Sequence, residues 1–375
     1  MQPIDKLNKV LTDIKEKFVG KNDVVDLLGV SLVARENAFL LGPPGTAKSA
    51  IVKQLSDAIE DGKNFEYLLT RFTEPNEIFG PFDIRKLKDG ELVTNTEGMM
   101  PEASLVFLDE IFNANSAILN SLLMALNERI FRRGKETRKL PVLMFVGASN
   151  QLPEDEALNA LLDRFLIRIQ SDYVDPDLLN QVLLAGWKMN DESAPSVQIT
   201  SGEIKLLQGQ CRQIDLTPVR EKYVDLVHNL RNTGIKVSDR RAVKLQNVIA
   251  ASAVLSNRTA ANISDFWVLK YIWDTEEQIE ILAGIIDQIL DSESHQNPHP
   301  QAIGNRVPNA EELIREVKLL TSKWHSTELS FEEKNVIKDK LRYVQNRSLW
   351  IKNTEHQQHI HNEIETLWQI IFQTV

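Results

Sequence analysis

A run of consecutive residues near the start of the chain has the types and spacing that a phosphate-binding loop requires. Gly42-Pro43-Pro44-Gly45-Thr46-Ala47-Lys48-Ser49 follows a predicted strand at 38–41 and begins a predicted helix at 48–60. In such a loop, consecutive backbone N–H groups wrap a phosphate, with a helix N-terminus behind them. The lysine then reaches the β- and γ-phosphates, and the serine hydroxyl ligates Mg²⁺. We therefore expect ATP to bind along Gly42, Pro43, Pro44, Gly45, Thr46, Ala47, Lys48, Ser49 and Ala50, with Ser49 as a metal ligand.

One residue departs from the usual pattern G-x-x-x-x-G-K-[ST]. Ala47 stands where a glycine normally precedes the lysine. Alanine is acceptable there if the residue has already entered helical backbone angles. Taken alone, the loop could also be an ordinary glycine turn.

A second acidic motif follows roughly 60 residues later. The apolar run Leu105-Val106-Phe107-Leu108 ends in Asp109 and Glu110. At the end of a buried strand, Asp109 is placed to hold Mg²⁺, mostly through water. Glu110 beside it is the natural general base for an attacking water. Two adjacent carboxylates could instead be solvated turn residues, but the phosphate loop favours the catalytic interpretation.

These residues need a sheet to position them, and the pattern predicts one. Short apolar runs at 38–41, 104–108, 142–146 and 165–169 alternate with helical patterns such as 48–60 and 116–128. This alternation predicts an α/β P-loop NTPase core with a parallel sheet. The expected organisation is an α/β nucleotide-binding core at 1–195, an all-α lid at 196–290, a linker at 291–308 and a helical extension at 309–375. The linker histidines, His295 and His299, are expected to be solvated.

The extension shows apolar positions at helical spacing, which predicts a helical hairpin or small bundle. The seams are Leu313, Val317, Leu320 and Trp324; Ile337, Leu341 and Val344; and Ile360, Ile364, Leu367 and Ile371.

Composition limits the class of protein. The net charge is −10, which disfavours a protein whose main task is to neutralise nucleic-acid phosphates. Cys211 is the single cysteine, so no intrachain disulfide is possible, and we expect it to be a small buried helix residue. No apolar run approaches the ~18 residues of a membrane span. A cytoplasmic location is the expectation.

The two motifs, with a third strand that ends Gly147-Ala148-Ser149-Asn150, resemble those of AAA+ ATPases. The resemblance implies that Asn150 is sensor 1, which orients the lytic water. It also implies that Arg164, after Asn159-Ala160-Leu161-Leu162-Asp163, is the arginine finger presented to a neighbouring subunit. Sensor 2, a lid arginine that contacts the γ-phosphate, is implied at Arg240, with Arg241 as the rival.

The resemblance narrows to the MoxR family and its RavA-like members over roughly residues 10–285. It rests on Phe79-Gly80-Pro81, Leu87-Lys88-Asp89-Gly90, Pro101-Glu102-Ala103, Val106 to Ile111, Ala117 to Asn120, Asn127-Glu128-Arg129, Ala148-Ser149-Asn150, Leu152-Pro153-Glu154, Asp163-Arg164, Val237 to Arg241 and Ala251-Ser252-Ala253. It implies a helix-2 insert at 79–100 and a β-hairpin at 129–140. The hairpin cations, Arg132, Arg133, Lys135, Arg138 and Lys139, could be solvated or could form a pore or interface contact.

From this resemblance we expect an ATPase that forms a homo-oligomeric, hexameric ring and remodels or activates a protein client. The family often acts beside a protein with a von Willebrand factor A domain. The β-rich insert that RavA uses to bind its partner has no counterpart in 309–375, so that partner is not carried over. The alternatives are an AAA+ motor on nucleic acid and a monomeric P-loop kinase or nucleotide switch.

Overall fold

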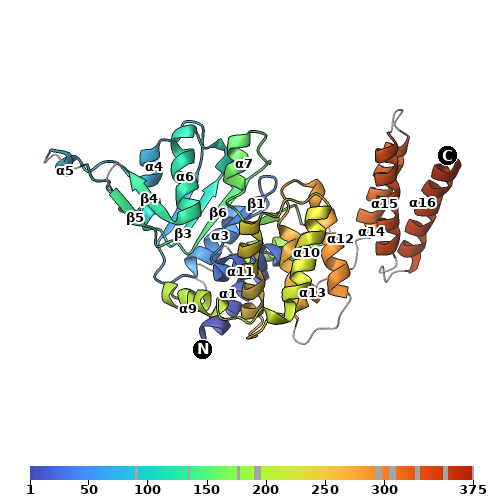
Figure 1. The fold of residues 1–375 in the computed structure, drawn as a ribbon, viewed down its shortest axis with the longest axis horizontal. Helices are drawn as coiled ribbons and strands as arrows, with labels where there is room; N and C mark the ends of the chain where they lie inside the picture. Colours follow the sequence, from blue (N-terminus) through green and yellow to red (C-terminus); the bar gives the residue numbers. More distant parts are fainter. Residues whose placement is uncertain are drawn as a thin grey trace. The chain divides into compact units, whose positions relative to one another are not determined.

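The computed structural model describes residues 1–88, 92–133, 136–174, 178–189, 196–291, 298–303, 310–325, 330–348 and 354–373. The chain divides into two compact units, residues 1–302 and 303–375. Figure 1 shows the elements in chain order. Among the described residues, no helix combines the length and hydropathy needed to cross a bilayer.

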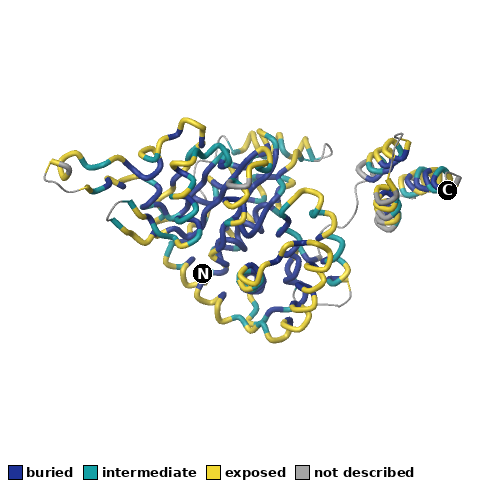
Figure 2. Tube along the Cα trace, turned by 45° about the horizontal axis from the view of Figure 1, so that its top comes forward, coloured by how far each residue is buried: buried dark blue, intermediate teal, exposed yellow. Residues whose placement is uncertain are grey.

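A five-stranded parallel sheet organises the first unit. Its strands are β1 (Ala38–Leu41), β2 (Asn64–Leu68), β3 (Leu105–Asp109), β6 (Met144–Ser149) and β7 (Ile167–Gln170), in the order β2-β3-β6-β1-β7. Every residue of β1 and β6 is buried, as expected for strands covered on both faces, and Figure 2 shows this buried centre in dark blue. The predicted strands are confirmed. The edge strand β2 was not predicted, because its exposed positions interrupt the apolar run.

Because the strands are parallel, they all end at one edge of the sheet. We call this the carboxyl edge, and the edge where the strands begin the amino edge. The register pairs Leu41 with both Ser149 and Gln170, so β1, β6 and β7 end at the same level. The residues that follow these strands therefore lie close together.

Helices α1 (Pro3–Lys17), α2 (Asn22–Ala34), α3 (Lys48–Asp57), α6 (Ser116–Glu128), α7 (Glu156–Leu162) and α8 (Leu179–Met189) complete the core. Every residue of α2 from Val24 to Ala34 is buried. The reason is that α2 contacts α1, the sheet and the lid at once.

The lid contains no strand among its described residues. It consists of α9 (Ser201–Cys211), α10 (Arg220–Asn232), α11 (Asp239–Leu255), the 3₁₀ helix η5 (Ile263–Tyr271) and α12 (Glu277–Asp291). Helices α9 and α11 pack against α2. The predicted combination of an α/β core, a helical lid and a helical extension is thus confirmed.

Part of the predicted linker is packed against the body of the first unit. Helix α13 (Pro300–Ile303) follows His299, whose ring stacks on Trp267 with centroids 4.7 Å apart. Burial lowers the pKa of His299 to about 4, and Gln301 donates to Asp26 at 2.7 Å. The expectation that His299 is solvated was wrong, because an aromatic surface of the lid covers it. His295 lies outside the described residues.

The second unit is a helical bundle of α14 (Ala310–Trp324), α15 (Phe331–Ser348) and α16 (Thr354–Gln373). The apolar residues at helical spacing form a single core, and every predicted seam position is buried in it.

Candidate functional site

Three neighbouring strands bring the predicted catalytic motifs to the carboxyl edge. The phosphate loop follows β1, Asp109 ends β3, and Asn150 follows β6, which lies between the other two. Adjacent strands are about 5 Å apart, so these motifs form one cluster.

The loop backbone shows how the phosphate site is built. Gly45 has φ 81° and Ala47 has φ 64°, while α3 begins at Lys48. Alternation between left- and right-handed conformations turns successive N–H groups into one concavity that suits an anion. Ala47 has therefore not yet entered the helix, and the turn into α3 holds it in a left-handed conformation. Alanine occupies that conformation at a cost of about 1 kcal/mol.

Lys48 lies inside the loop and is only 7% exposed. Its ammonium group donates to the carbonyl of Gly42, to the carbonyl of Pro43 at 3.0 Å and to Oδ1 of Asn150 at 3.1 Å. Burial lowers its pKa, while the carboxylates of Asp109 and Glu110 act in the opposite direction. The contacts place one positive charge between the loop and Asn150, near the carboxylates of Asp109 and Glu110.

Asn150 connects this lysine to the predicted base. Its Nδ2 donates to Oε1 of Glu110 at 2.5 Å, while its Oδ1 accepts from Lys48. Burial, and then the neighbouring charge of Asp109, raise the pKa of Glu110. A raised pKa makes a carboxylate a better proton acceptor. The arrangement therefore suits proton abstraction from a water held between Glu110 and Asn150.

The same edge offers the oxygen ligands that Mg²⁺ prefers. Asp109 is half-buried at the end of β3, and Ser49 is half-buried in the first turn of α3. One carboxylate and one hydroxyl, with water and phosphate oxygens, make up the usual coordination of Mg²⁺ in nucleotide sites. The donor set fits the metal that the sequence predicted.

Strand β7 anchors the loop from the other side. A Cβ atom on Gly42 would clash with the carbonyl oxygen of Ser171, so only glycine allows the two segments to approach this closely. The hydroxyl of Ser171 donates to the carbonyl of Thr46 at 3.2 Å and accepts from the buried ammonium group of Lys21 at 3.2 Å. Sequence reasoning missed Ser171 and Lys21, because neither belongs to a recognisable motif.

A cavity of about 290 Å³ lies beside this anchor. Its lining includes Gly20, Lys21, Tyr173 and Tyr271, from the turn before α2, the end of β7 and η5. The hydroxyl of Tyr173 donates to the carbonyl of Pro44 in the loop at 3.4 Å. The cavity is therefore next to the phosphate site, and its lining is partly aromatic.

Arg164 does not join this cluster. It follows α7, and its backbone carbonyl accepts from Asn37, the residue before β1, at 3.0 Å. Its guanidinium group pairs with Asp163 at 2.8 Å. The whole length of β1 separates Asn37 from the phosphate loop, so Arg164 lies at the amino edge of the sheet.

The two candidate sensor 2 arginines have different environments. Arg241 is buried and donates to Asp274 at 2.9 Å, in a cluster with Arg168, which is 1% exposed. Arg240 donates to the side chain of Asn127, at the end of α6. Because α6 ends at the amino edge, neither arginine lies at the phosphate loop of its own chain. Helices α9 and α11 of the lid pack on α2, so in this arrangement Arg240 lies away from the phosphate loop of its own chain.

The hairpin is confirmed as β4 (Ile130–Arg133) and β5 (Glu136–Lys139), and two of its cations have internal partners. Arg133 donates to the carbonyl of Gly80 and the side chain of Asn76, both at 2.7 Å, and covers the ring of Phe82 at 4.0 Å. Arg138 donates to Thr96 at 2.8 Å. These contacts attach the hairpin to the end of α4 (Pro75–Phe79) and to the predicted insert at 79–100, which includes α5 (Ile84–Lys88). Arg132 and Lys139 are exposed, and Lys135 lies outside the described residues.

Comparisons with protein families agree with this geometry. Residues 5–209 match the model of the MoxR domain in the MoxR-vWA-beta-propeller ternary systems, and residues 214–286 match the AAA lid domain. An uncharacterized protein of Methanocaldococcus jannaschii is 35% identical over 295 residues, which is 78% of this chain and 76% of that protein. The chaperone MoxR1 of Mycobacterium tuberculosis is 26% identical over 211 residues, which is 55% of this chain and 54% of its own length.

A solved structure supports the fold. A crystal structure from Cytophaga hutchinsonii superimposes with a TM-score of 0.62 at 20% sequence identity, and the match covers 78% of this chain and 95% of that one. At this identity the likeness concerns the arrangement of the core and the lid.

Proposed function

This chain belongs to the MoxR family of AAA+ ATPases, and on that premise we propose that it is a ring-forming Mg-ATP hydrolase that remodels or activates a protein partner. Lys48 and the loop amides would bind the phosphates, and Ser49 and Asp109 would hold Mg²⁺. Glu110 would accept the proton of a water that Asn150 orients. These roles follow from the contacts at the carboxyl edge.

One observation supports the assembly of several copies into a ring: the proposed catalytic residues lie at opposite edges of the sheet. Lys48, Glu110 and Asn150 contact one another at the carboxyl edge, whereas Arg164 lies beside the residue that precedes β1. The four residues of β1 span about 13 Å. An arginine at that distance needs the phosphate loop of another copy of the chain as its target. Arg164 would therefore complete the site of a neighbouring subunit.

The position of Arg240 follows the same division between the carboxyl edge and the amino edge. Its contact with Asn127 places it at the amino edge with Arg164. Arg241 is held by Asp274, which also pairs with Arg168, and so has no such freedom. We therefore propose Arg240 as sensor 2, acting on the nucleotide of the neighbouring subunit rather than on that of its own chain.

The cavity beside the loop is proposed to receive the adenine base. It adjoins Pro44, and it combines the rings of Tyr173 and Tyr271 with the backbone of Gly20. Base rings commonly stack on aromatic side chains. A base in this cavity would contact both the core and the lid.

The proposal that the chain acts on a protein partner rests on its membership of the MoxR family. The matching family model describes MoxR domains that occur with vWA and beta-propeller components, so we propose a von Willebrand factor A domain protein as a partner. The RavA-like subfamily, the hexameric state and the cytoplasmic location stay predictions.

Complementation between two inactive variants tests the proposal. Lys48→Ala removes the pocket but keeps the finger, and Arg164→Ala removes the finger but keeps the pocket. Each alone should lose ATP turnover by about 10³-fold or more, as for trans arginines in related phosphoryl-transfer enzymes. The mixture should recover part of the rate at interfaces that pair an intact pocket with an intact finger.

The control is a mixture of Lys48→Ala with Lys48→Ala/Arg164→Ala, which contains no complete interface and should stay inactive. If the first mixture is also inactive although both variants are folded and assembled, Arg164 does not act in trans. If Arg164→Ala alone keeps full turnover as a dilute monomer, the chain is a monomeric switch instead.

A further inference from the structure

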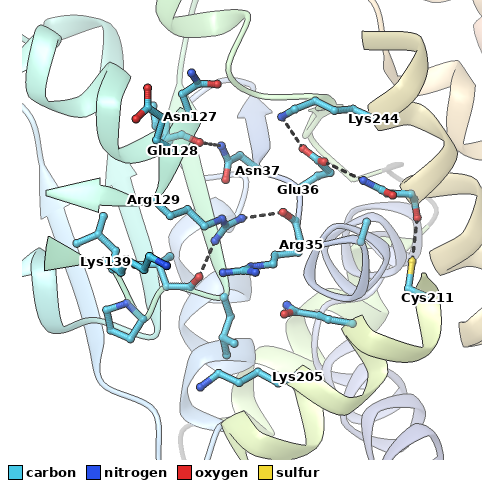
Figure 3. A pocket seen from close by; sticks show the side chains of 18 of the residues that line it. Arg35, Glu36, Asn37, Asn127, Glu128, Arg129, Lys139, Lys205, Cys211 and Lys244 are labelled. Atoms are coloured by element: carbon cyan, nitrogen blue, oxygen red, sulfur yellow. Dashed lines mark hydrogen bonds and ion pairs between the residues drawn. The ribbon is translucent and has the colours of Figure 1, made fainter. Parts of the chain in front are cut away.

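A larger cavity, of about 640 Å³, lies beside the amino edge of the sheet, between the core and the lid. One wall consists of the ends of α2 and α6 and of residues 139–143, and the other of α9 and α11. Figure 3 shows side chains from both walls around the same hollow. This volume is typical of sites that bind small molecules. The cavity is distinct from the phosphate loop, which lies at the opposite edge.

The lining is strongly cationic. Six basic side chains and two carboxylates line the cavity, a formal excess of four positive charges in a chain whose net charge is −10. The core contributes Arg35, Arg129 and Lys139, and the lid contributes Lys205, Arg212 and Lys244. Charges of one sign around a hollow with low-dielectric walls concentrate the potential inside it.

The two carboxylates leave most of this charge uncompensated. Glu36 is buried and is occupied by Lys244, whose ammonium group lies 3.0 Å away, and by Asn247 at 3.4 Å. Glu128 is exposed to solvent. Within the described part of the chain, Arg35, Lys139 and Arg212 form no ion pair.

Arg129 adds a fixed charge to the core wall. Its guanidinium group donates to the carbonyl of Val142 at 2.6 Å and to that of Arg35 at 2.7 Å. Carbonyl groups satisfy its hydrogen bonds but do not neutralise it. Burial, and then the nearby charge of Arg35, lower its pKa to about 10, so it remains charged at neutral pH. An anion in the cavity would relieve the repulsion between these two arginines.

We propose that this cavity binds a small anion that carries two or more phosphate groups, held between the cations of the core and those of the lid. Arginine and lysine are the side chains that best match phosphate oxygens. The cations converge on a hollow rather than follow a strip, which favours a compact ligand over a polymer. Since each wall supplies three cations, the ligand would hold the lid against the core. The inference does not depend on ATP hydrolysis.

Calorimetry with inorganic tripolyphosphate tests this site. The titration uses the full chain with Lys48→Ala, so that the phosphate loop does not contribute to binding. We expect one ligand per chain. The double variant Lys205→Ala/Arg212→Ala changes one exposed residue of α9 and the exposed residue that follows it, so the fold should persist. It should weaken binding by about tenfold or more, as expected for lost hydrogen bonds to a charged group.

The matched control removes the same charge elsewhere on the lid. Arg220→Ala/Lys222→Ala changes two exposed residues of α10, outside the cavity, and should alter binding by about twofold or less, because screened surface charges contribute little. Equal loss in both double variants, or no binding in the Lys48→Ala chain, would overturn the proposal. It would also be overturned if single-stranded DNA bound this chain more tightly than tripolyphosphate and lost affinity with Lys205→Ala/Arg212→Ala.

Discussion

The two edges of the sheet have opposite chemistry. At the carboxyl edge, the charges of Asp109 and Glu110 act on the buried Lys48, and Asn150 forms hydrogen bonds with both Lys48 and Glu110. At the amino edge, arginines predominate, including Arg164 and Arg240, with the cationic cavity beside them. Parallel strands produce this separation, because every residue that follows a strand lies at one edge and every residue that precedes a strand lies at the other.

On the proposed mechanism, one subunit therefore contains two separate halves of a catalytic site, and neither half is complete. In the proposed mechanism, the carboxyl edge binds the nucleotide and activates water. The two arginines proposed to act on the phosphates, Arg164 and Arg240, lie at the amino edge instead. Two copies placed edge to edge would bring the halves together.

The largest expected effect tests the carboxyl edge. Glu110→Gln should reduce ATP turnover by about 10²–10⁴-fold, since it removes the general base, while nucleotide binding persists. The control Glu66→Gln changes an exposed carboxylate on the edge strand β2 and should leave turnover unchanged. Because the pKa of Glu110 is raised, turnover of the native chain should decline with falling pH at values above those typical of a glutamate. Native turnover persisting below that range would exclude Glu110 as the base.

The same substitution should slightly stabilise the fold. A carboxyl whose pKa is higher in the folded than in the unfolded protein loses stability as pH rises through that interval. The penalty is absent below the unfolded pKa and complete above the folded one. Glu110→Gln should therefore raise the melting temperature at neutral pH, measured by calorimetry, and leave it unchanged in acid.

The second prediction concerns the cluster that positions the lid. Asp274→Asn would leave Arg168 and Arg241 buried without a counter-charge and should cost about 3–5 kcal/mol in the free energy of unfolding. Denaturant titration measures this cost. The control Asp239→Asn disrupts an exposed pair with Arg231, in which the aspartate side chain is 95% exposed, and should cost about 0–1 kcal/mol. Similar costs for the two variants would mean that the cluster does not secure the lid.

The cluster also predicts a pH dependence. Burial alone would raise the pKa of Asp274, but Arg168 and Arg241 outweigh it and hold that pKa below its ordinary value. Stability from such a group is complete above the unfolded pKa and is lost as pH falls through the folded one. The native chain should therefore lose more stability in acid than Asp274→Asn does.

A smaller effect separates the adjacent lid arginines. Arg240→Ala should reduce turnover of the assembled ring by about 10–100-fold, the value of a lost hydrogen bond to a charged group, with little change in stability. Arg241→Ala should instead destabilise the fold, because it removes a partner of Asp274. Steady-state turnover and denaturant titration on both variants provide the test. The reverse pattern would assign sensor 2 to Arg241.

The smallest effect concerns the loop itself. Ala47→Gly removes the left-handed strain, worth about 1 kcal/mol, but increases the entropy of the unfolded chain by a comparable amount. Stability should change by less than about 1 kcal/mol, and ATP affinity measured by calorimetry should be unchanged or slightly tighter. Strong destabilisation would show that the methyl group has a packing role.

The motifs and the strands could be predicted from sequence because their signals are local. The apolar run before Asp109 and the glycines of the loop are contiguous, so the parallel topology alone brings them together. The position of the lid could not be predicted in this way, because it depends on α2 being buried on all sides and on Arg168 meeting Asp274 far along the chain. For the same reason the edge of the sheet at which Arg240 lies could not be predicted from sequence.

Strand β7 has a mechanical consequence for an assembly. Within a few residues, the chain passes from Arg164, through Arg168 bound to the lid, to Ser171 bound to the loop. Because β7 pairs along its length with β1 at the edge of the sheet, a displacement of Arg164 would shift the loop and the lid together. In the proposed ring, hydrolysis in one copy would then be coupled to hydrolysis in its neighbour, and this communication would have a built-in direction.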